Sequence, residues 1–172
     1  MNEIIVIDAL DRIVAGWRKV FPDLDPDPLN VVGRVLVLAQ HLEKSVNSAL
    51  EQHNLTLGQF DILATLRRNG TRGELSPSEL RKNVALSSGG MTARLDKLEE
   101  AGLIARKQDP NDRRMLVIEL TPQGTQVIES ATATRFEEAR KSLPPLSNSE
   151  LETLAELLRK WLGTIEELSR NP

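Results

Sequence analysis

The sequence predicts a mainly α-helical fold with one short β-hairpin, and three observations support this prediction. Apolar residues recur at helical intervals over most of the 172 residues. Thr56, Ser76 and Ser147 each begin a capping box, in which a Ser or Thr is followed three residues later by Glu or Gln. Two runs with strand character, 103–108 and 115–120, surround a polar tip. A chain of this length can bury one core, with helical extensions.

The N-terminal third is expected to form two amphipathic helices. Residues 4–21 carry apolar side chains at helical spacing, and the Pro- and Asp-rich residues 22–28 end that helix. A longer helix is predicted over residues 29–53, with an apolar stripe so continuous that it must pack along its length. The stripe consists of Val31, Val35, Leu38, Leu42, Val46 and Leu50.

The central third is predicted to contain three helices followed by the hairpin. Capping boxes open helices over about 56–68 and 76–82, and the second of them also has Pro at its first helical position. The third helix is expected over 87–101, where Gly102 ends it in a left-handed turn. The apolar stripe of this third helix comprises Met91, Leu95 and Leu98.

Two amphipathic helices, 122–142 and 147–169, are predicted at the C-terminal end. Little else in the sequence can cover their apolar sides, so an interface between two copies of the chain is expected there. Its apolar positions are Leu151, Leu154, Leu158, Trp161, Leu162 and Ile165. The predicted divisions are N-terminal helices at 1–53, a central domain at 54–121 and C-terminal dimerisation helices at 122–172.

The composition argues against an enzyme and against a cofactor or metal site. Cysteine and tyrosine are absent, and His41 and His53 are far apart. The sequence has no glycine-rich phosphate loop and no paired metal-ligand motif. No catalytic residue is therefore expected, and the role of His41 stays open. The start of the chain lacks the basic region of a secretory signal, and no apolar stretch approaches a bilayer span, so a cytoplasmic location without membrane contact is expected.

Basic charge is concentrated in the middle of the chain although the net charge is −3. Residues 66–114 hold 11 Lys and Arg against 7 Asp and Glu, whereas residues 1–65 hold 5 against 9 and residues 115–172 hold 6 against 9. A short helix, a tight turn, a longer helix and a basic hairpin follow one another in this region. That order predicts a winged helix-turn-helix that binds double-stranded DNA.

The residues expected to contact DNA lie on the 87–101 helix and at the hairpin tip. Small polar residues in the first helical turn allow close approach to base edges in the major groove, and tip arginines suit the minor groove. Asp109 and Asp112 would brace the tip by ion pairing. The alternative is an ordinary helix cap followed by a solvated turn. The predicted DNA contacts are Ser87, Ser88, Gly90, Thr92, Arg94, Lys97, Arg113 and Arg114.

The region resembles the MarR family of multiple-antibiotic-resistance regulators. The similarity is carried by Asp-Pro-x-Asp-Arg-Arg at 109–114 and Leu-Thr-x-x-Gly at 120–124, and it extends from about Val32 to the last helix. The resemblance implies a homodimer whose interface is built from the first long helix and the two C-terminal helices. It also implies a regulator of transcription, with steric repression as the default.

The helix at 4–21 further resembles the urate-responsive branch of this family. That resemblance implies a site for a small anionic aromatic ligand made by Trp17, Asp61, Arg94 and Arg106. An anionic ring could stack on Trp17 while guanidiniums compensate its charge. Each residue also has an ordinary explanation, since Trp17 fits a core position, Asp61 a solvated one and Arg94 a phosphate contact.

Two alternatives in function stay open at this point. A regulator of the same type could respond instead to phenolic or aromatic carboxylate compounds, the ligands expected for the wider family. A protein of another class could use the winged helix for protein contact alone, without specific DNA binding. That second alternative leaves Arg113 and Arg114 without a role.

Overall fold

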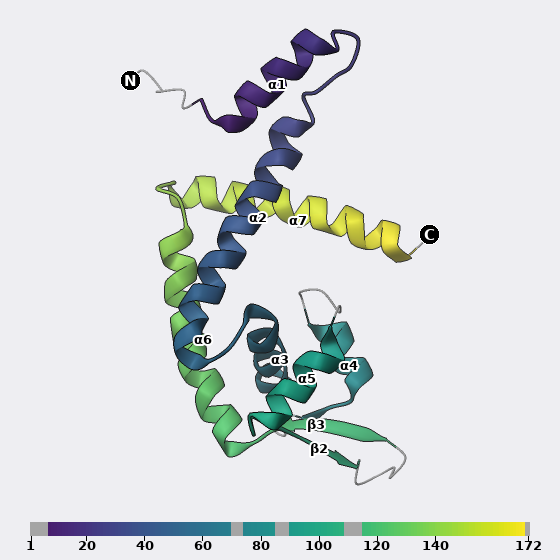
Figure 1. Cartoon of the computed structure of the whole chain (residues 1–172), viewed down its shortest axis with the longest axis vertical. Coiled ribbons are helices and arrows are strands. Elements are labelled where there is room, and N and C mark those ends of the chain that lie inside the picture. Colours follow the sequence, from purple (N-terminus) through teal and green to yellow (C-terminus); the bar gives the residue numbers. More distant parts are fainter. Residues whose placement is uncertain (1–6, 70–73, 85–89, 109–114, 171–172) are drawn as a thin grey trace. The chain divides into compact units, whose positions relative to one another are not determined.

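The computed structural model describes residues 7–69, 74–84, 90–108 and 115–170 (Figure 1). The described chain is mainly helical with one small sheet, which confirms the predicted fold class. It forms two compact units, residues 1–138 and residues 139–172. In chain order the elements are α1 (Ala9–Val20), α2 (Leu29–Leu50), the 3-10 helix η1 (Glu51–His53), α3 (Leu57–Arg68), β1 (Glu74–Leu75), α4 (Pro77–Asn83), α5 (Met91–Glu100), β2 (Ile104–Gln108), β3 (Leu116–Leu120), α6 (Pro122–Ser142) and α7 (Asn148–Arg170).

Helix α1 begins at Ala9 rather than at residue 4, because Asp8 is extended and caps it. The Asp8 carboxylate accepts hydrogen bonds from the backbone N–H groups of Leu10 and Asp11, at 2.7 and 3.1 Å. Asp11 returns the bond by accepting from the Asp8 N–H at 2.9 Å. The Arg34 guanidinium of α2 donates to both carboxylates at 2.8–3.1 Å, which ties the start of α1 to α2.

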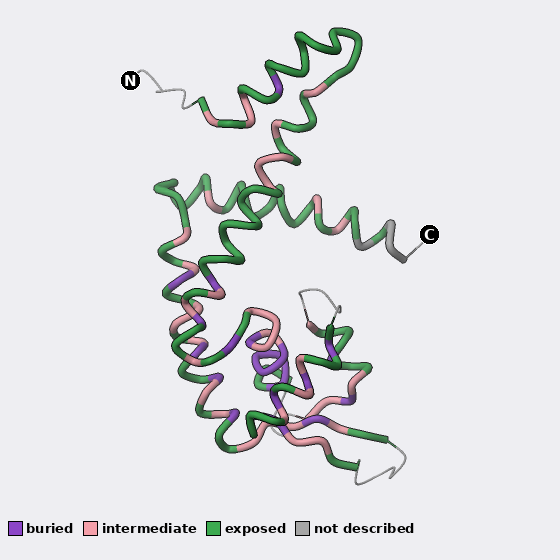
Figure 2. Tube along the Cα trace, viewed as in Figure 1, coloured by how far each residue is buried: buried purple, intermediate pink, exposed green. Residues whose placement is uncertain are grey.

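The core of the first unit lies where the C-terminal end of α2 meets α3, α4, α5 and the sheet (Figure 2). The predicted stripe of α2 is buried at this end only: Val46 and Leu50 are covered, whereas Val31 and Leu38 are 58% and 57% exposed within one chain. The capping boxes predicted at Thr56 and Ser76 are both present. Completely covered side chains of this core include Ile62, Leu63, Leu66, Leu80, Leu98, Ile118 and Ile128.

The sheet is three-stranded and antiparallel, in the order β1-β3-β2. Strands β2 and β3 confirm the predicted hairpin, with Arg106 opposite Ile118. Strand β1 was not predicted, because its two residues are too few to show an alternating pattern. It pairs Glu74 with Glu119 and Leu75 with Ile118, which adds a third strand beside β3.

The joint between the hairpin and α6 is held by the Leu-Thr-x-x-Gly segment. The Thr121 hydroxyl donates to the Gly102 carbonyl at 2.7 Å and accepts from the Gly124 N–H at 2.9 Å. Gly102 has a φ of +69°, so the predicted left-handed turn after α5 is confirmed. Gly124 faces the Leu103 carbonyl oxygen so closely that a β-carbon there would lie 1.9 Å from it. A side chain at position 124 is therefore excluded sterically.

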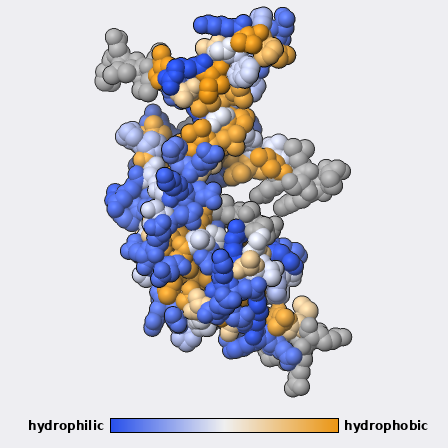
Figure 3. All heavy atoms as spheres, in the orientation of Figure 1, coloured by the Kyte–Doolittle hydropathy of each residue, from blue (hydrophilic) through white to orange (hydrophobic). Residues whose placement is uncertain are grey.

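Apolar side chains gather on the surface of α1 and the first half of α2 (Figure 3). In the second unit, α7 likewise exposes an apolar set within one chain: Leu154, Leu157, Leu158, Leu162 and Ile165. Large exposed apolar patches mark surfaces that bind other molecules. Among the described helices, none has the length and apolar character needed to cross a bilayer.

Candidate nucleic-acid interface and ligand pocket

Helix α5 separates a buried apolar face from an exposed small and polar one. Met91, Leu95 and Leu98 are buried, as the stripe predicted. Gly90 precedes the helix with a φ of +75°, a conformation that a side chain would strain. Ser87 and Ser88, two of the predicted DNA contacts, lie outside the described residues. The exposed positions of α5 include Thr92, Ala93 and Lys97.

Strands β2 and β3 extend as a hairpin from the same small domain (Figure 1). Lys107 forms an ion pair with Glu119 across the two strands, so this positive charge is partly compensated. The predicted tip residues lie outside the described part of the chain: Asp109, Asp112, Arg113 and Arg114. Their assignment therefore stays a prediction.

The Arg106 side chain lies on α5. Its Nη2 donates to Asp96 at 2.6 Å and its Nη1 donates to Glu99 at 2.8 Å. Both terminal nitrogens of the guanidinium thus bind carboxylates on one face of the helix. The sequence prediction that Arg106 contacts a ligand did not anticipate these partners, because residues 96 and 99 carry no motif.

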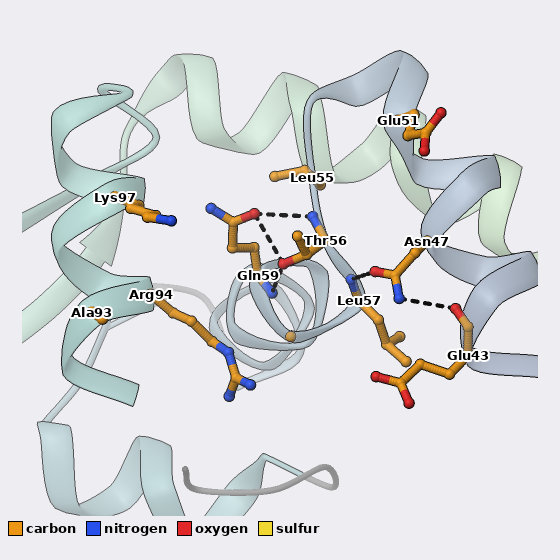
Figure 4. Close-up of a pocket in the computed structure, with 11 residues that line it drawn as sticks. Glu43, Asn47, Glu51, Leu55, Thr56, Leu57, Gln59, Ala93, Arg94 and Lys97 are labelled. Atoms are coloured by element: carbon orange, nitrogen blue, oxygen red, sulfur yellow. Dashed lines mark hydrogen bonds between the residues drawn. The ribbon is translucent and has the colours of Figure 1, made fainter. Parts of the chain in front are cut away.

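Arg94 projects from α5 toward the start of α3 (Figure 4). It lies against Gly58, whose missing side chain makes the space. Arg94 and Gly58 line two neighbouring cavities of about 580 and 430 Å³. The larger cavity is the more polar of the two, and in it Asn47 accepts a hydrogen bond from the Leu57 N–H at 2.8 Å. The smaller cavity is lined by Ala39, Leu42, Glu43, Val46, Leu57, Gly58, Arg94 and Arg135.

Asp61 lies on α3 near three positive charges. Burial raises the pKa of its carboxyl, and the charges of Arg135, Arg68 and Arg94 oppose that shift. Its Oδ2 atom is buried without a hydrogen-bond partner among the described residues. A carboxylate in this position is only partly compensated and attracts these arginines over a distance. The structure therefore places Asp61 and Arg94 in one electrostatic cluster, and it adds Arg135, which the sequence did not reveal.

Trp17 occupies a different place from the other predicted ligand residues. Its ring stacks on Phe21 with a centroid separation of 5.7 Å, and 47% of the residue is exposed. The Trp17 cavity has a volume of about 190 Å³ and does not contain Asp61, Arg94 or Arg106. Within one described chain, these four residues are therefore not gathered around one cavity.

Two residues of the site were missed by sequence reasoning. Gly58 falls inside the Thr56 capping box, so its only signal was a glycine within a helical pattern. Arg135 lies on α6, where nothing in the amphipathic repeat distinguishes it from a solvated arginine. It donates to Glu138 at 2.8 Å and also lines the smaller cavity. His41 is exposed on α2, and His53 bonds Thr134 through Nε2 at 2.8 Å.

Comparison with known proteins identifies the family. The MarR family model matches residues 55–116. The HTH-type transcriptional regulator PecS of Dickeya dadantii is 35% identical over 155 residues, which cover 90% of this chain and 91% of PecS. The crystal structure of a mutant MarR from E. coli in complex with operator DNA shares 26% identity, with a TM-score of 0.68 over 85% of this chain and 97% of that one.

A third similarity concerns the fold alone. BpsR of Bordetella bronchiseptica, whose structure describes the regulation of its DNA binding by 6-hydroxynicotinic acid, is 24% identical. Its TM-score is 0.68, over 76% of this chain and 91% of that chain. The PecS match spans nearly the whole of both proteins, and α4, α5 and the hairpin have the order of a winged helix-turn-helix. The chain therefore belongs to the MarR family of transcriptional regulators, which are not enzymes.

Proposed function

We propose that this protein is a homodimeric repressor that binds a pseudo-palindromic operator in double-stranded DNA and leaves it when a small anionic aromatic ligand binds. One observation carries the proposal: α5 buries Met91, Leu95 and Leu98 while it exposes a small and polar face beside the β2–β3 hairpin. A helix with that division can enter the major groove without losing core contacts. In this proposal residues 54–121 bind DNA, and residues 1–53 and 122–172 form the dimer.

The DNA contacts fall into two groups. Thr92 and Lys97 on α5, with Gly90 and the preceding Ser87 and Ser88, would approach bases and phosphates of the major groove. Arg113 and Arg114 would enter the minor groove from the hairpin tip, and Asp109 and Asp112 would brace them. Binding is expected to weaken steeply with salt, because phosphate contacts release counterions.

The homodimer is supported by the apolar surfaces that one chain leaves exposed. Val31 and Leu38 of α2, and Leu158 and Leu162 of α7, would be covered by a second copy. A two-fold dimer presents two copies of α5, so half-sites about 34–36 Å apart are expected in the operator.

The ligand is proposed to bind in the smaller cavity beside Arg94. Leu42, Val46 and Leu57 supply apolar walls for a flat ring, and Arg94 and Arg135 supply positive charge for its anionic group. A bound anion would compete with Asp61 for these guanidiniums. Because Arg94 belongs to α5, its movement would shift the helix and loosen the DNA.

Urate is the first candidate ligand, and phenolic or aromatic carboxylate compounds are the alternative. Arg106 is left out of the ligand contacts, because both of its terminal nitrogens already bind carboxylates of α5. Trp17 would stack on the ligand only if it reached the Arg94 cavity. Quenching of its fluorescence by urate, compared with a Trp17→Phe variant that keeps Trp161, tests that contact.

The deciding experiment is a gel-shift assay with the DNA upstream of the protein's own gene. Titrations with urate, xanthine, salicylate and 6-hydroxynicotinate distinguish the ligand classes. Release by urate supports the first candidate, whereas release only by the carboxylates supports the alternative. Absence of any sequence-specific footprint would favour a winged helix used for protein contact and would overturn the proposed function.

A further inference from the structure

Arg106 connects the two elements that are proposed to touch DNA. It lies in β2, the first strand of the hairpin, and its partners Asp96 and Glu99 lie on α5. The two ion pairs have N···O distances of 2.6 and 2.8 Å. The Arg106 side chain is 29% exposed, against 49% for Asp96 and 40% for Glu99. The cation is thus the better covered member of the cluster.

The chemistry of this cluster favours a fixed geometry. Asp96 and Glu99 are three residues apart, so they project from the same side of α5. A guanidinium is a planar, rigid group that can bind two carboxylates at once, whereas a lysine ammonium is a single point on a flexible chain. The Arg106 fork therefore restrains both the distance and the rotation between α5 and β2.

A second arginine connects α5 with α3. Arg94 is a residue of α5, and its side chain lies against Gly58 at the start of α3. The helix is therefore linked to α3 through Arg94 and to the hairpin through Arg106. The first contact belongs to the proposed ligand site, whereas the second lies between the two DNA-reading elements.

We infer that Arg106 is a positioning residue for DNA binding, which holds the recognition helix α5 and the wing at the separation that fits adjacent grooves of the operator. This inference rests on the proposed function. Arg106 acts through Asp96 and Glu99 and contacts neither DNA nor ligand. Without it, the orientation of the hairpin relative to α5 is less restrained, and each binding event must first restore that orientation.

Removing the two carboxylates separates this role from simple electrostatics. Asp96→Asn with Glu99→Gln makes the DNA-binding domain more positive by two charges, which by itself tightens binding to phosphates. The inference expects the opposite: operator affinity falls about tenfold, the scale of losing one or two charged hydrogen bonds. Affinity equal to or above that of the unaltered protein overturns the inference.

Variants of Arg106 complete the test. Arg106→Gln should lower operator affinity by a similar factor. The affinity of Arg106→Lys should lie between those of Arg106→Gln and the unaltered protein. Arg106→Glu combined with Asp96→Arg should bind the operator better than Arg106→Glu alone. The matched control is Arg67→Gln, which loses an equally charged pair with Glu129 between α3 and α6. Circular dichroism and thermal unfolding establish that each variant is folded before its affinity is compared.

Ligand titration distinguishes positioning from ligand contact. Calorimetric titration of urate, or of 6-hydroxynicotinate if urate does not bind, should give the same Kd for Arg106→Gln and for the unaltered protein. A large loss of ligand affinity in that variant would make Arg106 a ligand contact and overturn the inference. If the unaltered protein binds no operator, the proposed function fails; if it binds and the Asp96 and Glu99 variant binds as well, only the inference fails.

Discussion

Arg94 lies directly on Gly58: a β-carbon at position 58 would lie 2.6 Å from Arg94 Nε and 2.8 Å from its Cζ. Helix α5 therefore contacts the first turn of α3 through a long side chain that crosses the backbone where no side chain obstructs it (Figure 4). The Arg94 guanidinium can lie beside the cavity only because position 58 is glycine and carries no side chain.

Gly58→Ala should displace the Arg94 guanidinium without unfolding the protein. Alanine in a helix is favoured over glycine by about 0.5–1 kcal/mol, so thermal stability should be equal or slightly higher. Affinity for the anionic ligand should fall about tenfold, because a charged hydrogen bond is lost. Calorimetric titration measures this change. The control is Gly16→Ala, since no atom lies within 4 Å of a β-carbon there; equal ligand affinity in both variants would contradict the role of Gly58.

Asp61→Asn should stabilise the protein at neutral pH and not in acid. The pKa of Asp61 is raised in the folded state by burial. The stability that the protonated Asp61 carboxyl contributes is therefore fully present below the pKa of Asp61 in the unfolded chain. It is lost as the pH rises through the pKa of Asp61 in the folded state. The neutral Asn escapes that loss, and the gain should stay below about 1 kcal/mol because the group is only half buried.

Urea unfolding at fixed protein concentration, from about pH 3 to pH 8, tests this pH dependence. The two proteins should converge in acid and diverge toward neutral pH. Asp23→Asn, at an exposed position in the connector after α1, should follow the unaltered protein throughout. A variant at position 61 that is less stable than the unaltered protein at neutral pH would show that the arginines outweigh burial.

Arg34→Gln should release α1 from α2 while leaving the DNA-binding domain folded. The guanidinium bridges Asp8 and Asp11, and its loss removes both ion pairs. Hydrogen exchange should accelerate in α1 and stay unchanged in α3 and α5. The exposed pair of Arg18 with Asp27 provides the control, because Arg18→Gln removes an equal charge without disturbing the cap. Unchanged protection of α1 in the Arg34 variant would mean that apolar packing alone holds it.

The same contact should weaken in acid. The pKa of Asp11 is lowered by the hydrogen bond from the Asp8 backbone and next by the Arg34 side chain. Its contribution is therefore present above the unfolded pKa and is lost as the pH falls through the folded-state value. Exchange in α1 should then accelerate, relative to α3, as the carboxyl becomes protonated. A constant ratio of α1 to α3 protection across that range would exclude a role for the Asp11 charge.

Arg113→Ala with Arg114→Ala should abolish operator binding while leaving the dimer intact. Two phosphate-region charges are removed, so residual binding should also have a shallower salt dependence, by about two in the slope. Gel shifts at several salt concentrations and size-exclusion chromatography measure both properties. Arg12→Ala with Lys19→Ala removes two exposed charges from α1 and serves as the control. Operator affinity retained by the tip variant would refute the assignment of the wing.

Local chemistry explains which elements could be predicted from the sequence. The boxes at Thr56 and Ser76 are complete within four residues, so the starts of α3 and α4 needed no tertiary information. The stripe of α5 and the hairpin strands also repeat with their own periods. The predicted start of α1 was wrong, because the reciprocal cap between Asp8 and Asp11 begins the helix at Ala9, although apolar residues continue at helical spacing before it. Strand β1 exists only because β3 offers it a partner.

The site was harder to predict than the fold, because its contacts join distant segments. Arg106 pairs with residues 7 and 10 positions before it. The turn at Gly102 was predicted, but the sequence does not show that the Arg106 side chain lies back on α5. Arg135 reaches the cavity from α6, and Gly58 matters only because Arg94 crosses it. The resemblance to the urate-responsive branch, rather than residue types alone, singled out Asp61 and Arg94. It did not indicate that Trp17 would line a cavity of its own.

The Gly124 contact has a mechanical consequence for any signal that passes between the wing and α6. Because the α6 backbone at Gly124 lies close against the Leu103 carbonyl, the segment between β3 and α6 has no free space in which to absorb a displacement. A shift of α6 that closes this gap must push the hairpin, and a shift that opens it must strain the Thr121 hydrogen bonds. The close approach of Gly124 to Leu103 thus couples small movements of the helix to movements of the wing.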